Sequence, residues 1–119
     1  MMEARAISRH NRHSARKMRM VIDLIRGKRV DEAHAILQFS KKKGAEIIDK
    51  TLRSAVANAR DKADKENTVV DVDDLYVKEA YVNEGARLKR YRAAAQGRAA
   101  PITRPTCHVV VVVDTKESK

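Results

Sequence analysis

Two histidines and a Cys-His pair have the residue types of a metal site. His10 and His13 are three residues apart, and Cys107 is followed directly by His108. Imidazole nitrogen and thiolate sulfur are donors that zinc prefers. The histidines, however, lie in a basic segment, where they are more simply interpreted as solvated side chains or as part of a binding surface. Cys107 is interpreted as a small residue at the start of a strand, and we expect neither a metal nor a cofactor.

A carboxylate cluster is the second candidate for chemistry. Asp71, Asp73 and Asp74 could together hold Mg²⁺, which prefers oxygen ligands. Such a cluster more often marks the turn that enters a strand, and we favour that interpretation. The chain has no Gly-rich phosphate loop, and no Ser-His-Asp or Cys-His arrangement is singled out by its spacing. We therefore expect that the protein is not an enzyme.

The distribution of charge is the strongest signal in the sequence. The chain of 119 residues has a formal net charge of +10. Residues 1–30 carry nine basic and two acidic side chains, residues 31–84 carry nine and 12, and residues 85–105 carry six and none. Two basic blocks thus flank a mildly acidic middle. This pattern indicates an anionic polymer bound by two parts of the chain.

Other bulk features exclude several classes of protein. No apolar run approaches the roughly 18 residues of a membrane helix, and the first ten residues contain no apolar region typical of a secretory signal. A single cysteine, Cys107, excludes an internal disulfide and fits a reducing compartment. We expect one domain, residues 1–119, with an arm at about residues 85–105.

Apolar spacing predicts three helices. Residues 14–27 place Met18, Val21, Ile22 and Ile25 on one stripe, with Ser14 as N-cap and Gly27 as the end. Residues 30–39 predict a short second helix. Residues 44–65 predict the longest one, in which large apolar residues give way to alanines. Those alanines indicate close approach to another element.

Strand signals precede and follow these helices. Residues 75–83 and the run His108–Val113 are rich in β-branched residues. The continuous valine run predicts burial on both faces or a central place in the sheet. Residues 3–9 predict a further strand. The chain is therefore expected to be an α+β protein.

Residues 85–105 lie between two predicted strands and contain few large apolar side chains. If those strands are antiparallel neighbours, this segment is a very long hairpin connection whose halves could each project roughly 30 Å. Gly85 and Gly97 are expected at flexible or positive-φ positions. Pro101 and Pro105 have no N–H to donate, so we expect regular pairing to fail at both. The segment is interpreted as a basic arm that reaches away from a small body.

The basic side chains of both blocks are the candidate binding residues. The guanidinium fork of arginine suits phosphate oxygens and also stacks on bases. Recognition is expected to depend on backbone charge and shape, as for folded RNA, because there is no RNP-type aromatic pair. The candidates are Arg9, Arg12, Arg16, Lys17, Arg19, Arg26, Lys28, Arg87, Lys89, Arg90, Arg92, Arg98 and Arg104.

Several separated motifs resemble one known family. They are SARKMRMVIDLIRGKRVDEAHAIL, SAVANA at Ser54–Ala59, DDLYVKEAYVNEGARLKR, GRAAPI and TCHVVVVV. Each is weak alone, but their order and spacing together are specific. From about Ala4 to Val113 the chain resembles the bacterial form of the large-subunit ribosomal protein 22 family.

The resemblance implies an α+β fold with three helices packed on a small three-stranded antiparallel sheet and a long protruding basic β-hairpin. It implies a structural component of the large ribosomal subunit that binds large-subunit ribosomal RNA, supports subunit assembly and lines the nascent-peptide exit tunnel with its hairpin. The implied partners are that RNA, neighbouring ribosomal proteins and, transiently, the nascent peptide, with no membrane and no homo-oligomer. The implied location is the cytoplasm, and an organellar ribosome is also compatible.

The resemblance also places the arm residues. Lys89 and Arg90 match the basic pair on the outgoing limb, and residues 97–99 match the return. The family usually has Pro where this chain has Ala86, and Pro-Arg where it has Ala93 and Ala94, so a fixed φ and a charge are lost here. Arg92 offers a compensating charge. The implied tunnel-facing tip comprises Tyr91, Arg92, Ala93, Ala94, Ala95 and Gln96.

Two other binding functions remain as alternatives. A DNA-architectural protein can combine a helical body with basic β-arms, but it usually needs a dimer and an apolar or Pro wedge at the arm tip. Here the tip is AAAQG, and Pro101 lies on the return limb. A cationic membrane-surface protein needs an amphipathic helix with large aromatic anchors, which this chain lacks.

Overall fold

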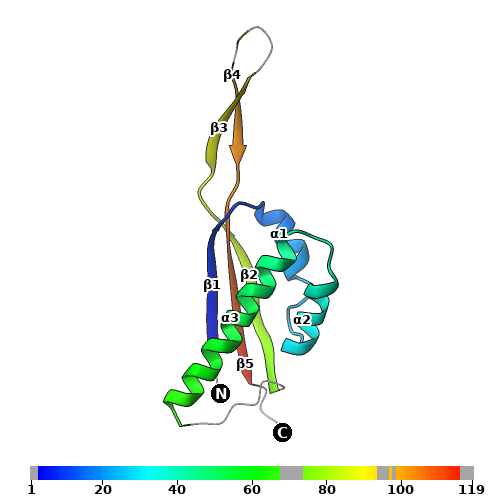
Figure 1. The fold of residues 1–119 in the computed structure, drawn as a ribbon, viewed down its shortest axis with the longest axis vertical. Helices are drawn as coiled ribbons and strands as arrows, with labels where there is room; N and C mark the ends of the chain where they lie inside the picture. Colours follow the sequence, from blue (N-terminus) through cyan, green and yellow to red (C-terminus); the bar gives the residue numbers. More distant parts are fainter. Residues whose placement is uncertain (1–2, 68–73, 94–96, 98, 116–119) are drawn as a thin grey trace.

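The computed structural model describes residues 3–67, 74–93, 97 and 99–115. Within these residues, three helices cover one face of an antiparallel sheet, and a second, two-stranded sheet projects from one end (Figure 1). The long dimension of the molecule is 68 Å. The elements are β1 (Ala4–Asn11), α1 (Ala15–Ile22), α2 (Val30–Phe39), α3 (Gly44–Lys65), β2 (Leu75–Glu84), β3 (Leu88–Ala93), β4 (Ala99–Arg104) and β5 (Cys107–Thr115).

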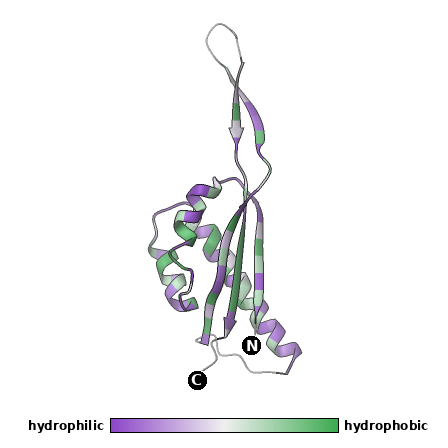
Figure 2. Cartoon of the chain, turned by 180° about the vertical axis from the view of Figure 1, so that it is seen from behind, coloured by the Kyte–Doolittle hydropathy of each residue, from purple (hydrophilic) through white to green (hydrophobic). Residues whose placement is uncertain are grey.

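The body sheet has the order β1-β5-β2, with both pairings antiparallel. The valine run therefore occupies the central strand, as predicted. Val109, Val111 and Val113 are fully buried, and Val110 and Val112 on the other face are also buried. Hydrophobic positions run along the body strands (Figure 2). The α+β class, the three helices and the strand near the start of the chain are thereby confirmed.

The second face of the sheet is shielded by neighbouring strands. Val110 pairs with Ile7 on one side and with Tyr81 on the other. Both neighbours are only partly exposed, at 37% and 39%. Side chains of edge strands that flank a central position lie close enough to cover it. This explains how valines on the face without helices are almost inaccessible to solvent.

The helices match the predicted segments, with one correction. The second and third helices have the expected bounds, but α1 ends at Ile22 rather than near Gly27. Beyond Ile22 the chain turns, and Gly27 N–H donates to the Val77 carbonyl while Val77 N–H donates to the Lys28 carbonyl. Pairing with β2 therefore replaces the last helical turns. Ser14 precedes α1 as expected, but its side chain makes no capping hydrogen bond.

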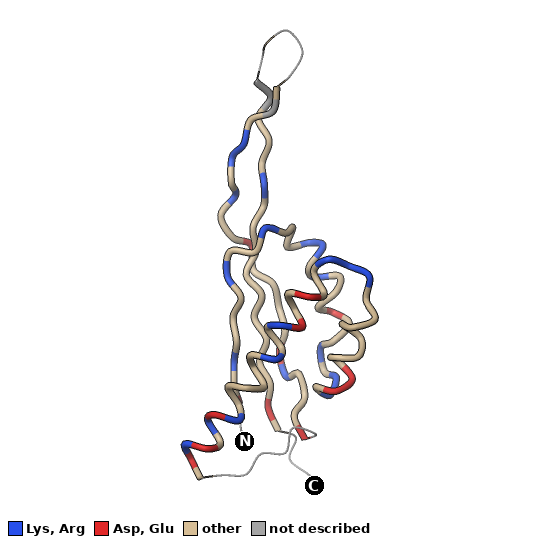
Figure 3. The backbone as a smooth tube through the Cα atoms, viewed as in Figure 1, with Lys and Arg blue, Asp and Glu red and all other residues tan. Residues whose placement is uncertain are grey.

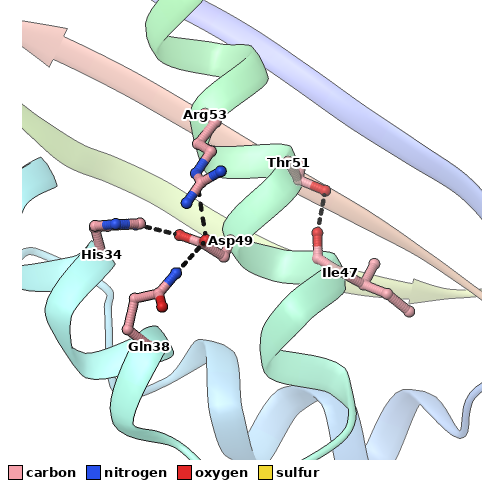
Figure 4. Close-up of polar contacts among 6 residues, drawn as sticks. All are labelled: His34, Gln38, Ile47, Asp49, Thr51 and Arg53. Carbon is pink, nitrogen blue, oxygen red and sulfur yellow. Dashed lines mark hydrogen bonds and ion pairs between the residues drawn. The ribbon is translucent and has the colours of Figure 1, made fainter.

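A buried carboxylate joins α2 to α3. Asp49, only 7% exposed, lies 2.6 Å through Oδ1 from His34 Nδ1, and its Oδ2 accepts a 3.2 Å hydrogen bond from Gln38 Nε2 (Figure 4). Arg53 Nε lies 3.4 Å from the same Oδ2. A buried carboxylate is tolerated only where such partners satisfy its oxygens. Asp49 thus holds the two helices at a fixed spacing.

Candidate nucleic-acid interface

The arm is built as a paired ribbon rather than as an irregular loop. β3 and β4 pair in antiparallel register, with Leu88 opposite Arg104, Arg90 opposite Ile102 and Tyr91 opposite Pro101. The expectation that pairing fails at Pro101 is therefore wrong. Each strand of a two-stranded ribbon has an open edge, and a proline whose missing N–H faces that edge costs no ladder bond. Pairing does end before Pro105, as expected.

A narrow neck connects the arm to the body. Between the two sheets, Gly85 N–H donates to the Thr106 carbonyl at 2.9 Å, and Thr106 Oγ1 donates to the Ala86 carbonyl. A Cβ on Gly85 would lie 2.6 Å from Thr106 Oγ1. Gly85 is thus needed for close approach, whereas Gly97 has the expected positive φ, +74°.

Basic residues gather at the arm end of the molecule. Lys and Arg occupy both strands of the arm, the β1–α1 junction and the α2–α3 connection, while Asp and Glu lie mostly on the helices and toward the far end (Figure 3). The exposed candidates are Arg9, Arg12, Arg16, Lys17, Arg19, Arg26, Lys28, Arg87, Lys89, Arg90 and Arg104. Of these, Lys28 lies away from the arm, beside Val77 near the start of β2. Tyr91 and Ala93 of the expected tip are also exposed. Arg98, Ala94, Ala95, Gln96 and the side chain of Arg92 lie outside the described part of the structure.

Two candidates are bonded to the open edge of β2. Arg19 donates through Nε and Nη2 to the Val82 carbonyl, at 3.2 and 2.9 Å. Arg26 donates through Nε and Nη2 to the Ala80 carbonyl, at 3.0 and 2.7 Å, and its Nη1 lies 2.8 Å from Asp23 Oδ1. Each guanidinium uses two donors on one backbone oxygen. These bonds protect an edge strand that would otherwise present unpaired carbonyls.

A groove lies between the arm root and the body. It has a volume of about 1020 Å³ and is lined by residues of the β1–α1 junction, the α2–α3 connection and both arm strands. Its basic residues are Arg12, Lys17, Lys43, Arg90 and Arg104. Lys43 was not among the expected binding residues, because it belongs to neither of the two basic blocks. The fold, not the sequence spacing, brings it beside the arm.

The candidate zinc ligands do not form a cluster within the part of the chain that the structure describes. The backbone N–H of His10 donates to His108 Nδ1 at 3.1 Å, and the two imidazole rings meet edge to face with centroids 5.1 Å apart. Across the described residues, no three His, Cys, Asp or Glu side chains come close enough to hold a metal ion. Asp71 and Asp73 lie outside those residues.

The cysteine is part of the core. Cys107 is fully buried in β5. Burial raises the pKa of its thiol, while the charge of Arg19 and a backbone hydrogen bond from His13 act in the opposite direction. A buried thiol with a raised pKa is a poor nucleophile. In addition, no helix of the described chain is long and apolar enough to cross a membrane.

Comparison with known proteins identifies relatives along nearly the whole chain. Residues 6–114 match the family model described as ribosomal protein L22p/L17e. The large ribosomal subunit protein uL22 of Bifidobacterium longum (strain DJO10A) is 55% identical over 116 residues, which cover 98% of each chain. The proteins of the same name from Ligilactobacillus salivarius and Halothermothrix orenii are 53% and 50% identical, over 95% and 98% of this chain and 94% and 98% of theirs.

Proposed function

The chain belongs to the ribosomal protein L22p/L17e family, and from that premise we propose that it binds large-subunit ribosomal RNA through its arm and the adjoining end of its body. It is a bacterial-type protein of the large ribosomal subunit and acts in translation as a structural component, not as an enzyme. Its place is therefore the ribonucleoprotein particle in the cytoplasm.

The observation that supports this proposal most strongly is that the arm has no hydrophobic core of its own. Leu88 and Ile102 are the large aliphatic residues of the ribbon, and both remain partly exposed. A two-stranded hairpin alone is marginally stable in water. A partner must supply the missing burial, and the exposed cations of the arm select a polyanion. RNA phosphates meet both requirements.

The body contributes the second half of the interface. Arg9, Arg12, Arg16 and Lys17 are exposed and belong to the first basic block, and so does Lys28, which lies farther from the arm, beside Val77. We assign them to phosphate contacts together with the cations of the arm. Arg19 and Arg26 are weaker candidates for phosphate contacts, because each already donates two N–H groups to a β2 carbonyl.

The finer proposal concerns the end of the arm. The arm strands β3 and β4 project along the longest axis of the molecule, which measures 68 Å (Figure 1), and residues 91–96 are those at and after the end of β3 in the sequence. We propose that this end, with Tyr91 exposed, lines the nascent-peptide exit tunnel, where it contacts the nascent peptide transiently. The chain then acts as one domain, residues 1–119, with its arm at about 85–105. Anchoring separate RNA segments by arm and body would also support subunit assembly beside neighbouring ribosomal proteins, without homo-oligomer formation.

An arm deletion tests the proposal. Replacing residues 87–104 with a short turn removes six cations. We expect the body to stay folded by circular dichroism and to bind ribosomal RNA with a salt dependence whose slope is shallower by up to about five units. An unchanged slope would show that the arm does not bind RNA. Equal affinity for DNA and RNA duplexes would instead favour the DNA-architectural alternative.

A further inference from the structure

The groove beside the arm root combines cations with an apolar floor. From the arm, Leu88 and Ile102 line it together with Arg90 and Arg104. Because paired residues of an antiparallel ribbon lie on the same face, the pairs Leu88–Arg104 and Arg90–Ile102 place all four side chains on one side. That face therefore alternates aliphatic and guanidinium groups. The opposite face begins with Lys89 and Thr103, which do not line the groove.

The facing wall comes from the body. Arg12 lies at the β1–α1 junction, Lys17 lies in the first turn of α1, and Lys43 lies just before α3. Among the described residues that line the groove, none is acidic. The groove thus carries positive charge on both walls around a strip of apolar surface.

We infer that this groove binds an unpaired RNA strand, with phosphates on the two basic walls and a base or sugar against the aliphatic floor. The inference rests on the proposed RNA-binding function and names the form of RNA that this site takes. An A-form duplex keeps its bases stacked inside and presents solvated phosphates and 2′-hydroxyls, which would leave the floor unused. An unpaired strand can turn a base inward, against the exposed parts of Leu88 and Ile102.

Adjacent arm residues provide a matched pair of variants. Arg90→Gln and Lys89→Gln each remove one charge from an exposed side chain, but only Arg90 faces the groove. The probes are an oligouridine of about 12 nucleotides and an RNA duplex of the same length, titrated against the full chain by fluorescence anisotropy. We expect the wild type to prefer the oligouridine. Arg90→Gln should weaken oligouridine binding about tenfold, and Lys89→Gln less than about threefold.

The floor is tested separately from the charge. Leu88→Ala combined with Ile102→Ala leaves every cation in place, and Thr103→Ala on the opposite face is its control. We expect the double variant to lose the preference for oligouridine while keeping its duplex affinity, and the control to keep both. Because an arm variant can simply misfold, each protein is first compared with wild type by circular dichroism. Arg90→Gln and Lys89→Gln leave the apolar floor intact, so their comparison supports or overturns the inference even if the floor variant misfolds.

The possible failures are distinguishable. If the wild type binds neither probe, the proposed RNA-binding function itself is wrong. If the wild type binds both probes equally and the Arg90 and Lys89 variants lose affinity equally, RNA binding stands and the groove assignment is overturned. If a polyglutamate peptide binds the wild type more tightly than oligouridine and loses affinity with Arg90→Gln, the groove takes an acidic protein segment and the inference is again overturned.

Discussion

Gly85 and Thr106 face each other at the neck, where the hydroxyl of Thr106 occupies the space that a side chain at position 85 would need. A Cβ on Gly85 would lie 2.6 Å from Thr106 Oγ1 and 3.1 Å from His108 Nε2. The same hydroxyl donates to the Ala86 carbonyl, so it cannot rotate away without losing that bond. The position of the arm therefore depends on the absence of a side chain at residue 85.

We expect Gly85→Ala to lower the free energy of unfolding by about 1–3 kcal/mol, through overpacking at the neck. Urea denaturation measures the change. Thr106→Ala removes the obstructing oxygen, so the double variant should be less destabilised than the sum of the single variants. Simple additivity of the two changes would contradict this account of the neck.

Arg26 and Lys17 should respond differently to the same substitution. Arg26→Met removes the donors that reach the Ala80 carbonyl and should lower the free energy of unfolding by about 1 kcal/mol. Lys17→Met also removes one charge, but it should leave stability unchanged and reduce the salt slope of RNA binding by about one unit. Denaturation and RNA titration of both variants test the division between structural and RNA-binding cations. The prediction fails if both variants lose RNA affinity equally and neither loses stability.

Asp49 is predicted to be the most sensitive carboxylate of the helical layer. Asp49→Asn removes the buried charge that His34, Gln38 and Arg53 satisfy, and we expect a loss of about 1–3 kcal/mol in the free energy of unfolding. Asp61→Asn is the matched control, because Asp61 is exposed and its 3.4 Å ion pair with Lys65 lies on the surface. Its effect should stay within about 0.5 kcal/mol. Equal effects of the two substitutions in thermal denaturation would contradict the role given to Asp49.

Cys107 is predicted to be unreactive in the folded protein. Burial raises the pKa of its thiol, so at any given pH less of it is thiolate than in an unfolded chain, and the reagent also cannot reach it. At about pH 8, labelling by a disulfide reagent should be slow in buffer and fast in urea. Raising the pH should increase the labelling rate of the unfolded chain first. Rapid labelling under native conditions would show that β5 is less well packed than described.

Most of the fold was predictable because the local signals agree with one another. The apolar stripes of α2 and α3 and the valine run of β5 each have one reasonable interpretation, and the structure has all three. The end of α1 was not predictable from its own residues. Gly27 and Lys28 leave the helical path because they pair with Val77, about 50 residues later in the chain.

The site was predictable in composition but not in arrangement. Charge counting identified the arm and the first basic block, whereas the bonds of Arg19 and Arg26 to β2 depend on tertiary structure. Lys43 joins the groove only because the α2–α3 connection folds toward the arm. Pro101 misled the prediction, since a proline rule for interior strands was applied to a ribbon with open edges.

Co-sedimentation tests the central claim most directly. Native cells are lysed, ribosomal subunits are separated on a sucrose gradient and washed with high salt, and the chain is quantified by mass spectrometry in every fraction. A protein bound to ribosomal RNA through both arm and body should remain with the large subunit at near-unit stoichiometry. Loss of the chain from the large subunit in this wash, or its migration with DNA, would contradict the account.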